Sequence, residues 1–186
     1  MRHGNLFVIS GPSGAGKGTL VARLLRAVPD AWVSVSVTTR VPRAGEVDGV
    51  HYHFATDAEF QHLVDEDGLL EWATYAGNRY GTPRAEVEER MAQGDQVVLE
   101  IDVQGAFQVR EKMPQAHLVF VEPPSMEVLE ARLRGRGTES DEVIASRLRA
   151  ARVELACKME YDVRLVNDNL DEAVAELVRF VNEQAE

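Results

Sequence analysis

Short continuous apolar runs alternate along most of the chain with longer segments whose apolar residues recur at helical spacing. Four short apolar runs, each typical of a buried strand, occupy residues 6–10, 97–101, 117–121 and 164–166. Segments with apolar residues at helical spacing lie between or after them, at residues 19–28, 103–112, 125–134, 142–159 and 171–182. This alternation indicates an α/β fold with a parallel sheet that helices cover on both faces. We expect Ser125 and Asp171 to be the N-caps of their helices.

Two regions interrupt this alternation. Residues 32–83 begin with a strand-like pattern, in which Val33, Val35 and Val37 alternate with serines, and continue as turn-rich polar sequence. Residues 125–152 are dense in arginine and helix-forming residues. We interpret both regions as insertions at the carboxyl ends of the strands, where open α/β sheets bind ligands.

Composition narrows the possible partners. The 186 residues suit one domain, and no apolar run approaches the ~18 residues of a membrane span. The chain has 20 basic and 31 acidic residues, and its net charge of −11 argues against general nucleic-acid binding. The single cysteine, Cys157, excludes an internal disulfide and fits a reducing compartment. We therefore expect a soluble cytoplasmic protein with neither a membrane nor a nucleic acid as partner.

The stretch Ser10-Gly11-Pro12-Ser13-Gly14-Ala15-Gly16-Lys17-Gly18-Thr19 nearly matches the phosphate-loop pattern G-x-x-x-x-G-K-[ST]. Successive N–H groups and the N-terminus of the next helix form an anion cradle, and Lys17 adds a positive charge. A glycine-containing turn without a ligand is the alternative, but the strand–loop–helix context favours phosphate binding. Gly18 replaces the hydroxyl that usually ligates magnesium. The ion must then use phosphate oxygens, water, a carboxylate or Thr19.

Two pairs of charged residues suggest further phosphate chemistry. Glu100 and Asp102 are two residues apart near the end of an apolar run, so we expect both to point to the same side. Such a pair beside a phosphate loop suggests magnesium or its water shell, whereas capping of backbone amides is the alternative. Arg40 and Arg43 lie three residues apart, and their two guanidinium groups are suited to grip one phosphate. A solvated basic turn is the alternative for that pair.

Several segments, taken in order, closely resemble guanylate kinase. They are Gly11-Pro12-Ser13-Gly14, residues 36–54, Leu70-Glu71-Trp72-Ala73, residues 77–82, Asp102-Val103-Gln104-Gly105, residues 134–139 and Val166-Asn167-Asp168. The resemblance extends over residues 5–182 and implies a P-loop kinase that transfers phosphate from ATP to GMP with magnesium, in purine nucleotide metabolism. It also implies a parallel-sheet core at about 1–33, 92–124 and 153–186, an inserted GMP-binding subdomain at about 34–91, and a helical lid at about 125–152.

The resemblance also implies roles for individual residues. The catalytic group would be Lys17, Arg40, Asp102, Arg136 and Arg147. ATP would be bound by Gly11, Pro12, Ser13, Gly14, Ala15, Gly16, Lys17, Gly18, Thr19, Arg134, Arg136 and Asn167, the last of these in a loop near the adenine. GMP would be bound by Ser36, Arg40, Arg43, Glu46, Tyr52, Glu71, Tyr80, Thr82, Glu100 and Asp102. Magnesium would be held by Asp102 through water and, as a weaker candidate, by Thr19.

Glu71 is the residue on which base choice depends in this interpretation. Guanine presents N–H donors at its ring and amino nitrogens, and a buried carboxylate that accepts two of them would select guanine over adenine. By itself Glu71 is compatible with an ordinary glutamate at the end of a helix, and only the resemblance gives it this role. Glu100 departs from the family, which has the shorter aspartate there, so its direct contact with GMP stays open.

Two other functions remain as alternatives. Some relatives of guanylate kinase have become scaffold domains that bind phosphorylated peptides, but these generally sit in longer chains and have lost parts of the ATP site. A kinase for another nucleoside monophosphate is the second alternative. We expect a monomer or a small homo-oligomer.

Overall fold

A five-stranded parallel sheet forms the centre of the protein. The computed structural model describes residues 2–135, 137 and 139–186. The strand order is β2 (Ala31–Val33), β7 (Gln96–Glu100), β1 (Asn5–Ser10), β8 (His117–Glu122) and β9 (Val163–Val166), and every neighbouring pair is parallel. β1 therefore lies in the middle, between β7 and β8. Its side chains beyond Asn5 are fully buried, which explains the continuous apolar run in the sequence.

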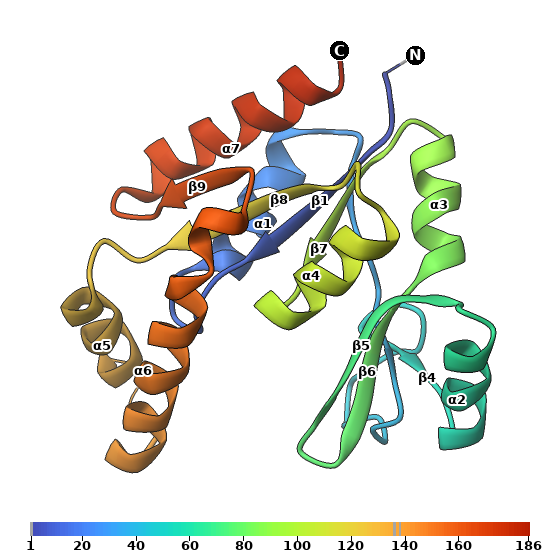
Figure 1. Ribbon diagram of the computed structural model, residues 1–186, viewed down its shortest axis with the longest axis horizontal. Coiled ribbons are helices and arrows are strands. Elements are labelled where there is room, and N and C mark those ends of the chain that lie inside the picture. Colours follow the sequence, from blue (N-terminus) through green and yellow to red (C-terminus); the bar gives the residue numbers. More distant parts are fainter. Residues whose placement is uncertain (1, 136, 138) are drawn as a thin grey trace.

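Helices cover both faces of this sheet (Figure 1). Because successive side chains of a strand point to opposite faces, Leu6 and Val8 belong to one core and Phe7 and Ile9 to the other. α4 (Val103–Lys112) and α3 (Arg84–Ala92) pack on the first face. α1 (Lys17–Ala27) and α7 (Leu170–Gln184) pack together on the second. The expected α/β fold is confirmed.

Residues 37–83 build a second sheet beside the first. Its strand order is β4 (His53–Phe54), β3 (Val37–Thr38), β6 (Asn78–Pro83) and β5 (Leu69–Tyr75), and β5 and β6 form an antiparallel hairpin. α2 (Asp57–Asp65) begins with a capping box at Thr56 and Glu59. The small core under α2 contains Val37, Phe60 and Leu69.

Two helices form the other projection from the central sheet. α5 (Met126–Gly135) and α6 (Asp141–Ala156) pack on each other through their own apolar cluster, whose buried members are Leu129, Leu133, Ile144 and Ala151. A short 3₁₀ turn, η1 (Lys158–Glu160), leads from α6 to β9. Figure 1 shows this helix pair and the second sheet projecting from the same side of the central sheet. None of the helices within the described ranges is both long and apolar enough to cross a bilayer.

The predicted core elements are confirmed, and some details differ. The valine–serine alternation is not one strand, because β2 ends at Val33 and β3 begins at Val37. The helix expected to reach residue 159 ends at Ala156. Asp171 is not the N-cap of α7, since Asn169 accepts the amides of Asp171 and Glu172, and Asp171 lies in the first turn, where its charge suits the helix dipole. Ser125 precedes α5 and accepts the amide of Val128 at 3.2 Å, as expected for a cap.

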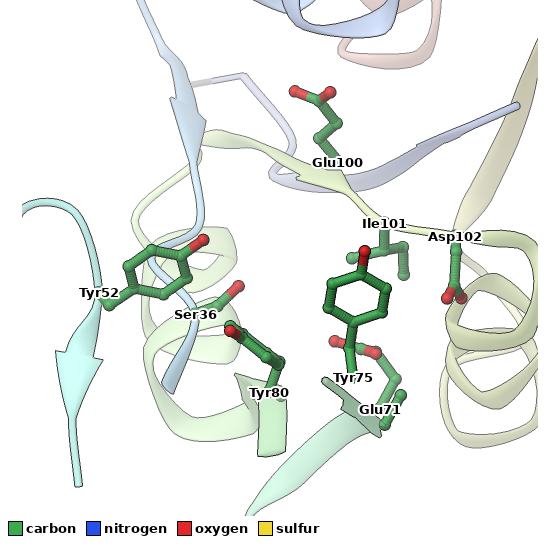
Figure 2. Close-up of a pocket in the computed structure, with 10 residues that line it drawn as sticks. Ser36, Tyr52, Glu71, Tyr75, Tyr80, Glu100, Ile101 and Asp102 are labelled. Carbon is green, nitrogen blue, oxygen red and sulfur yellow. The ribbon is translucent and has the colours of Figure 1, made fainter. Parts of the chain in front are cut away.

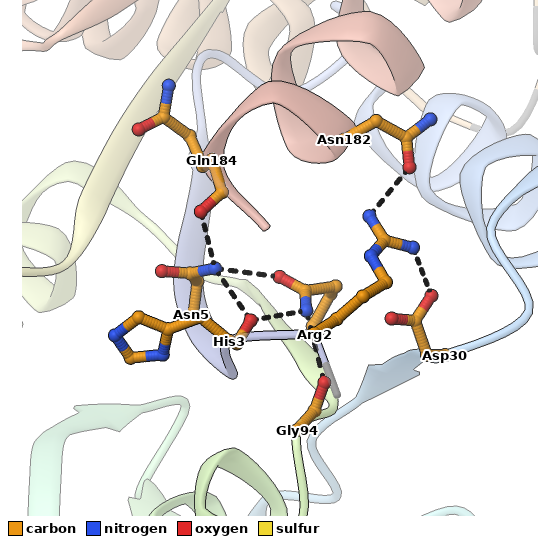
Figure 3. Close-up of polar contacts among 8 residues, drawn as sticks. Arg2, His3, Asn5, Asp30, Gly94, Asn182 and Gln184 are labelled. Carbon is orange, nitrogen blue, oxygen red and sulfur yellow. Dashed lines mark hydrogen bonds and ion pairs between the residues drawn. The ribbon is translucent and has the colours of Figure 1, made fainter. Parts of the chain in front are cut away.

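Side chains at the amino ends of the strands join the two termini of the chain (Figure 3). Gln96 is fully buried and donates from Nε2 to the carbonyls of His3 and Gly94, at 2.8 and 3.1 Å. Its Oε1 accepts Nδ2 of Asn5 at 3.0 Å, and the same Nδ2 donates to the carbonyl of Gln184 at 3.0 Å. One buried amide therefore connects β7, the N-terminal segment and, through Asn5, the end of α7.

Replacement of Gln96 by leucine tests this connection. Gln96→Leu keeps a similar volume but leaves buried polar partners unpaired, so we expect the free energy of unfolding to fall by about 1–3 kcal/mol. Urea denaturation measures this difference. Arg2→Ala, which removes the exposed contacts with Asp30 and Asn182, is the control and should cost at most about 1 kcal/mol. Equal stability of Gln96→Leu and the wild type would contradict the assigned role.

Candidate active site

The glycine-rich loop connects β1 to α1 and lines a cavity of about 330 Å³. Its lining residues are Ser13, Gly14, Gly16, Lys17, Gly18, Thr19 and Glu100. Nζ of Lys17 donates to the carbonyls of Gly11 and Pro12, at 2.6 and 3.2 Å. The ammonium group and the N-terminus of α1 thus lie at the same cavity, an arrangement suited to anions.

A second cavity, of about 390 Å³, lies between the second sheet and the carboxyl end of β7 (Figure 2). Its walls are formed by Ser36, Tyr52, Glu71, Ala73, Tyr75, Tyr80, Gly81, Glu100, Ile101 and Asp102. Four of these, Ala73, Tyr75, Gly81 and Ile101, were not among the predicted site residues. Tyr75 is a largely exposed aromatic side chain at the end of a strand, and its position just before the turn at Gly77 is the one signal for it in the sequence.

Glu71 is an acidic side chain that is almost fully buried in this second cavity. It is 7% exposed, and its Oε1 accepts the hydroxyl of Thr82 at 2.6 Å. Burial raises the pKa of Glu71 above its usual value, the charge of Asp102 raises it too, and the hydrogen bond from Thr82 opposes the rise. Gly105 on α4 approaches closely, since a Cβ there would lie 2.8 Å from Oε2 of Glu71. A desolvated carboxylate in a cavity can accept hydrogen bonds from a ligand that presents N–H donors.

Arg40 and Arg43 lie in the same turn, but their environments differ. Nη2 of Arg40 pairs with Oε1 of Glu46 at 2.8 Å, and its guanidinium lies over the ring of Tyr52 at 5.3 Å. Oε2 of Glu46 accepts the backbone amide of Arg43 at 2.7 Å. These hydrogen bonds, led by the one from Arg40, lower the pKa of Glu46 to about 2. Glu46 thus organises the arginine turn, while Arg43 remains exposed.

The expectation that Glu100 and Asp102 point to the same side is wrong. β7 ends at Glu100, and Asp102 is already the N-cap of α4, where its Oδ1 accepts the amide of Gly105 at 2.8 Å. Because the strand geometry stops between them, the two side chains diverge, as Figure 2 shows. Glu100 nevertheless lines both the phosphate-loop cavity and the second cavity. Burial raises its pKa, against the effect of the Lys17 charge.

The residues around the phosphate loop suit a magnesium ion that takes most of its ligands from water and from substrate phosphates. Within the described ranges, no three histidine, cysteine, aspartate or glutamate side chains converge as a metal site. The available oxygen donors are the Glu100 carboxylate and the Thr19 hydroxyl, which both line the cavity. Asp102 lines only the second cavity and is a candidate through water. Magnesium often keeps several waters and binds through one or two carboxylates and substrate phosphates, so this small donor set fits it.

The arginines of the helix pair are placed in different ways. Nη1 of Arg147 donates to Oγ of Ser13 at 2.6 Å, and Nη2 pairs with Glu139. Arg134 pairs with Glu130 and Asp141, both carboxylates of the helix pair itself. The structure therefore brings Arg147 to the phosphate loop and leaves Arg134 on the surface of the helix pair. Arg136, which we expected to be catalytic, lies outside the described residues.

Asn167, which we expected near the adenine of ATP, follows β9 and lies against the phosphate loop. It is 6% exposed, and its Nδ2 donates to the carbonyl of Ala15 at 2.8 Å. Arg132, which the sequence analysis did not select, donates from Nη2 to the carbonyl of Asn167 at 2.8 Å. Nothing in the spacing of these residues signals such contacts.

Together, the fold and the loop define a P-loop kinase architecture with two projections beside the phosphate site. The family model described as guanylate kinase matches residues 3–184. Among similar proteins, the guanylate kinase of Thermobifida fusca (strain YX) is 59% identical over 95% of this chain and 90% of its own. That of Synechocystis sp. (strain ATCC 27184 / PCC 6803 / Kazusa) is 55% identical over 97% and 95%. The chain belongs to the guanylate kinase family.

Solved structures agree with this assignment. The crystal structure of guanylate kinase from Anaplasma phagocytophilum aligns with a TM-score of 0.76 and 33% identity, over 100% of this chain and 89% of that one. A gluconokinase from Sinorhizobium meliloti 1021 aligns with a TM-score of 0.52 and 19% identity, over 100% and 95%, and shares the fold. The resemblance noted in the sequence is thus confirmed.

The hydrogen bond between Glu71 and Thr82 gives a direct test of the site's electrostatics. Because this bond opposes the rise caused by burial, Thr82→Val should raise the pKa of Glu71 further. Carbon-13 NMR titration of the glutamate carboxyls measures the shift. Thr74→Val, at an exposed position of the same hairpin, should leave it unchanged. A pKa that does not rise in Thr82→Val would show that the hydroxyl does not act on the carboxylate.

Proposed function

We propose that this protein transfers the γ-phosphoryl group of ATP to GMP and so forms ADP and GDP. The observation that carries the proposal is the position of Glu100, which lines both the phosphate-loop cavity and the cavity that holds Glu71. Two adjoining cavities, one suited to phosphate and one with a buried acceptor, can bring a donor and an acceptor nucleotide together. Membership of the guanylate kinase family supports the same reaction.

Base choice would rest on Glu71. Its carboxylate is buried and already accepts the Thr82 hydroxyl, and a ligand that offers two adjacent N–H donors satisfies its remaining acceptor positions. Guanine has such donors. Adenine would leave these acceptor positions unpaired, and the site would select guanine over adenine by up to ~10⁴-fold. Ser36 would donate to the carbonyl oxygen of the base, and Thr82 would reach the same oxygen only by giving up its hydrogen bond to Glu71. Tyr52 and Tyr80 would contact the acceptor phosphate.

Phosphoryl transfer requires the protein mainly to position the two nucleotides and to neutralise their charges. Lys17 and Arg147 are placed at the phosphate loop, and Arg40 lies beside the second cavity with its turn ordered by Glu46. We propose that these three side chains, together with Arg136, neutralise the negative charge of the phosphoryl group during its transfer. Arg43 would add to the grip on the acceptor phosphate, and Arg134 to the ATP side.

Magnesium bound with ATP would supply further neutralisation of the phosphates. Glu100, Asp102 and Thr19 are the residues that would hold it, with Asp102 acting through water. We further predict a cytoplasmic location, no nucleic-acid partner, and a monomer or small homo-oligomer.

A coupled assay for ADP with ATP, magnesium and GMP tests the proposal. We expect ADP and GDP to form at equal rates, and much slower turnover with AMP, CMP or UMP. A preference for AMP would overturn the role of Glu71. Absence of transfer to every nucleotide, combined with binding of a phosphorylated peptide, would instead support the scaffold function.

The lysine of the loop should be essential for turnover. Lys17→Met removes a cation that faces the phosphates, and we expect kcat to fall by at least ~100-fold, as when one preorganised donor is lost. The free energy of unfolding should stay close to that of the wild type. The matched control is Lys112→Met, because Lys112 pairs with Asp67 and lines neither cavity. Turnover that survives Lys17→Met would exclude this lysine from the mechanism.

Replacement of Glu71, the glutamate of the second cavity, should weaken the use of GMP and not that of ATP. Glu71→Gln turns one acceptor into a donor, so the KM for GMP should rise by between ~10²- and ~10⁴-fold. The KM for ATP should change little. Glu88→Gln, the same change at an exposed position on α3, is the control. An equal effect on both nucleotides would contradict base recognition by Glu71.

The same variant isolates the pH dependence of GMP binding. Protonated Glu71 loses an acceptor, so GMP affinity should decrease as the pH falls through the pKa of this residue. Burial raises that pKa, and the loss should therefore begin at a higher pH than for an ordinary glutamate. Glu71→Gln should lack this component of the pH profile.

A further inference from the structure

The side chain of Asn167 holds one peptide group of the phosphate loop. Its Nδ2 donates to the carbonyl of Ala15 across a distance of 2.8 Å, in a fully buried contact. The Asn167 backbone is fixed as well, because its amide donates to the carbonyl of Glu122 at 2.9 Å and its carbonyl accepts Arg132 at 2.8 Å. Asn167 is therefore anchored to β8 and α5 while its amide group reaches the loop.

Fixing the Ala15 carbonyl also fixes the N–H of Gly16. The two groups belong to one planar trans peptide, in which C=O and N–H point in opposite directions. Ala15 is fully buried, whereas Gly16 lines the phosphate-loop cavity. The hydrogen bond from Asn167 thus holds the carbonyl at a buried contact, and the N–H of the same peptide, which belongs to a residue that lines the cavity, points the opposite way. An anion cradle needs a donor on that side.

Gly16 and Asn167 are sterically matched. Gly16 has a φ of 95°, and a Cβ built on it would lie 2.3 Å from Nδ2 of Asn167. Only glycine allows both this backbone conformation and the close approach of the amide. The loop glycine therefore makes room for the side chain that orients the loop.

Helix α5 supports the same contact. Arg132 reaches the Asn167 carbonyl, and one turn of leucines on this helix, Leu129 and Leu133, packs against Gly14, where an added Cβ would lie 3.0 and 3.1 Å from their methyl groups. The start of the predicted lid is thus packed directly on the phosphate loop.

We propose that Asn167 is a positioning residue that presents the Gly16 N–H to the phosphates of the donor nucleotide, and that its side chain acts on triphosphate binding and not on base choice. The proposal rests on the proposed function only in taking ATP as the donor. It differs from the adenine contact expected from the sequence, because the side-chain donor is already directed at the loop.

Three variants separate these roles. Asn167→Asp replaces the donor with an acceptor that opposes the Ala15 carbonyl, and Asn167→Ala removes the donor without adding a charge. Asn169→Asp is the matched control, since it adds the same charge two residues away at a cap whose side chain only accepts. Thermal unfolding checks that all three variants are folded. If Asn167→Asp does not fold, Asn167→Ala alone provides the test.

Calorimetry with inorganic tripolyphosphate, ATP and GTP, each with magnesium, provides the measurement. We expect Asn167→Ala to weaken tripolyphosphate and ATP binding by the same factor, about tenfold for one lost hydrogen bond. Asn167→Asp should weaken both ligands at least as much, because it also adds a negative charge. The ratio of ATP to GTP affinity should stay unchanged in both variants. The Gly16 amide resonance should also shift in both. Asn169→Asp should bind all three ligands as the wild type does.

The opposite pattern would overturn the proposal. Weaker ATP binding with unchanged tripolyphosphate binding would assign Asn167 to the adenine, and unchanged binding of both would remove it from the site. Because tripolyphosphate binding needs no GMP, these results are distinct from a failure of the proposed reaction. A wild type that binds tripolyphosphate but forms no ADP with GMP would disprove that reaction alone.

Discussion

The common direction of the central strands is the constraint on which the site depends. β1 lies between β7 and β8, and all five strands are parallel, so the segments that follow them emerge at one edge. The phosphate loop follows β1, Glu100 and Asp102 stand at the end of β7, and Asn167 follows β9. Residues more than 150 positions apart in the chain, such as Ala15 and Asn167, meet there as a result. The strand order thus determines where the site lies, and the second sheet and the helix pair form its walls.

The cationic side chains at this edge are hydrogen-bonded to acidic side chains or to backbone carbonyls. Arg40 is paired with Glu46, Arg147 with Glu139, and Lys17 donates to two loop carbonyls. In a chain of net charge −11, these pairs keep the cationic groups ordered beside the cavities. A phosphate must exchange with existing partners, so its binding energy is a difference between two sets of charge-assisted hydrogen bonds. Order in the side chains lowers the entropic cost of that exchange.

The sequence predicted the periodic elements and the loop well, because both depend on local patterns. Continuous apolar runs gave the central strands, and the glycine spacing gave the phosphate loop. Local patterns failed where a strand ended one residue early, which turned Glu100 and Asp102 apart, and where Asn169 took the cap expected at Asp171. Arg132 and the inward direction of Asn167 had no local signal at all, since both depend on how α5 and β9 pack against the loop. The assigned roles of the site residues remain predictions.

The buried amide of Gln96 has a consequence for the handling of this protein. It ties both ends of the chain to the start of β7, and Figure 1 shows the two termini close together. That border is the amino edge of the sheet, whereas the phosphate-loop cavity and the second cavity lie at the carboxyl ends of the strands. Tags or fused partners attached at either end will therefore sit on the far side of the molecule, and a short peptide bridge can join the termini into a circular chain without approaching the ligands.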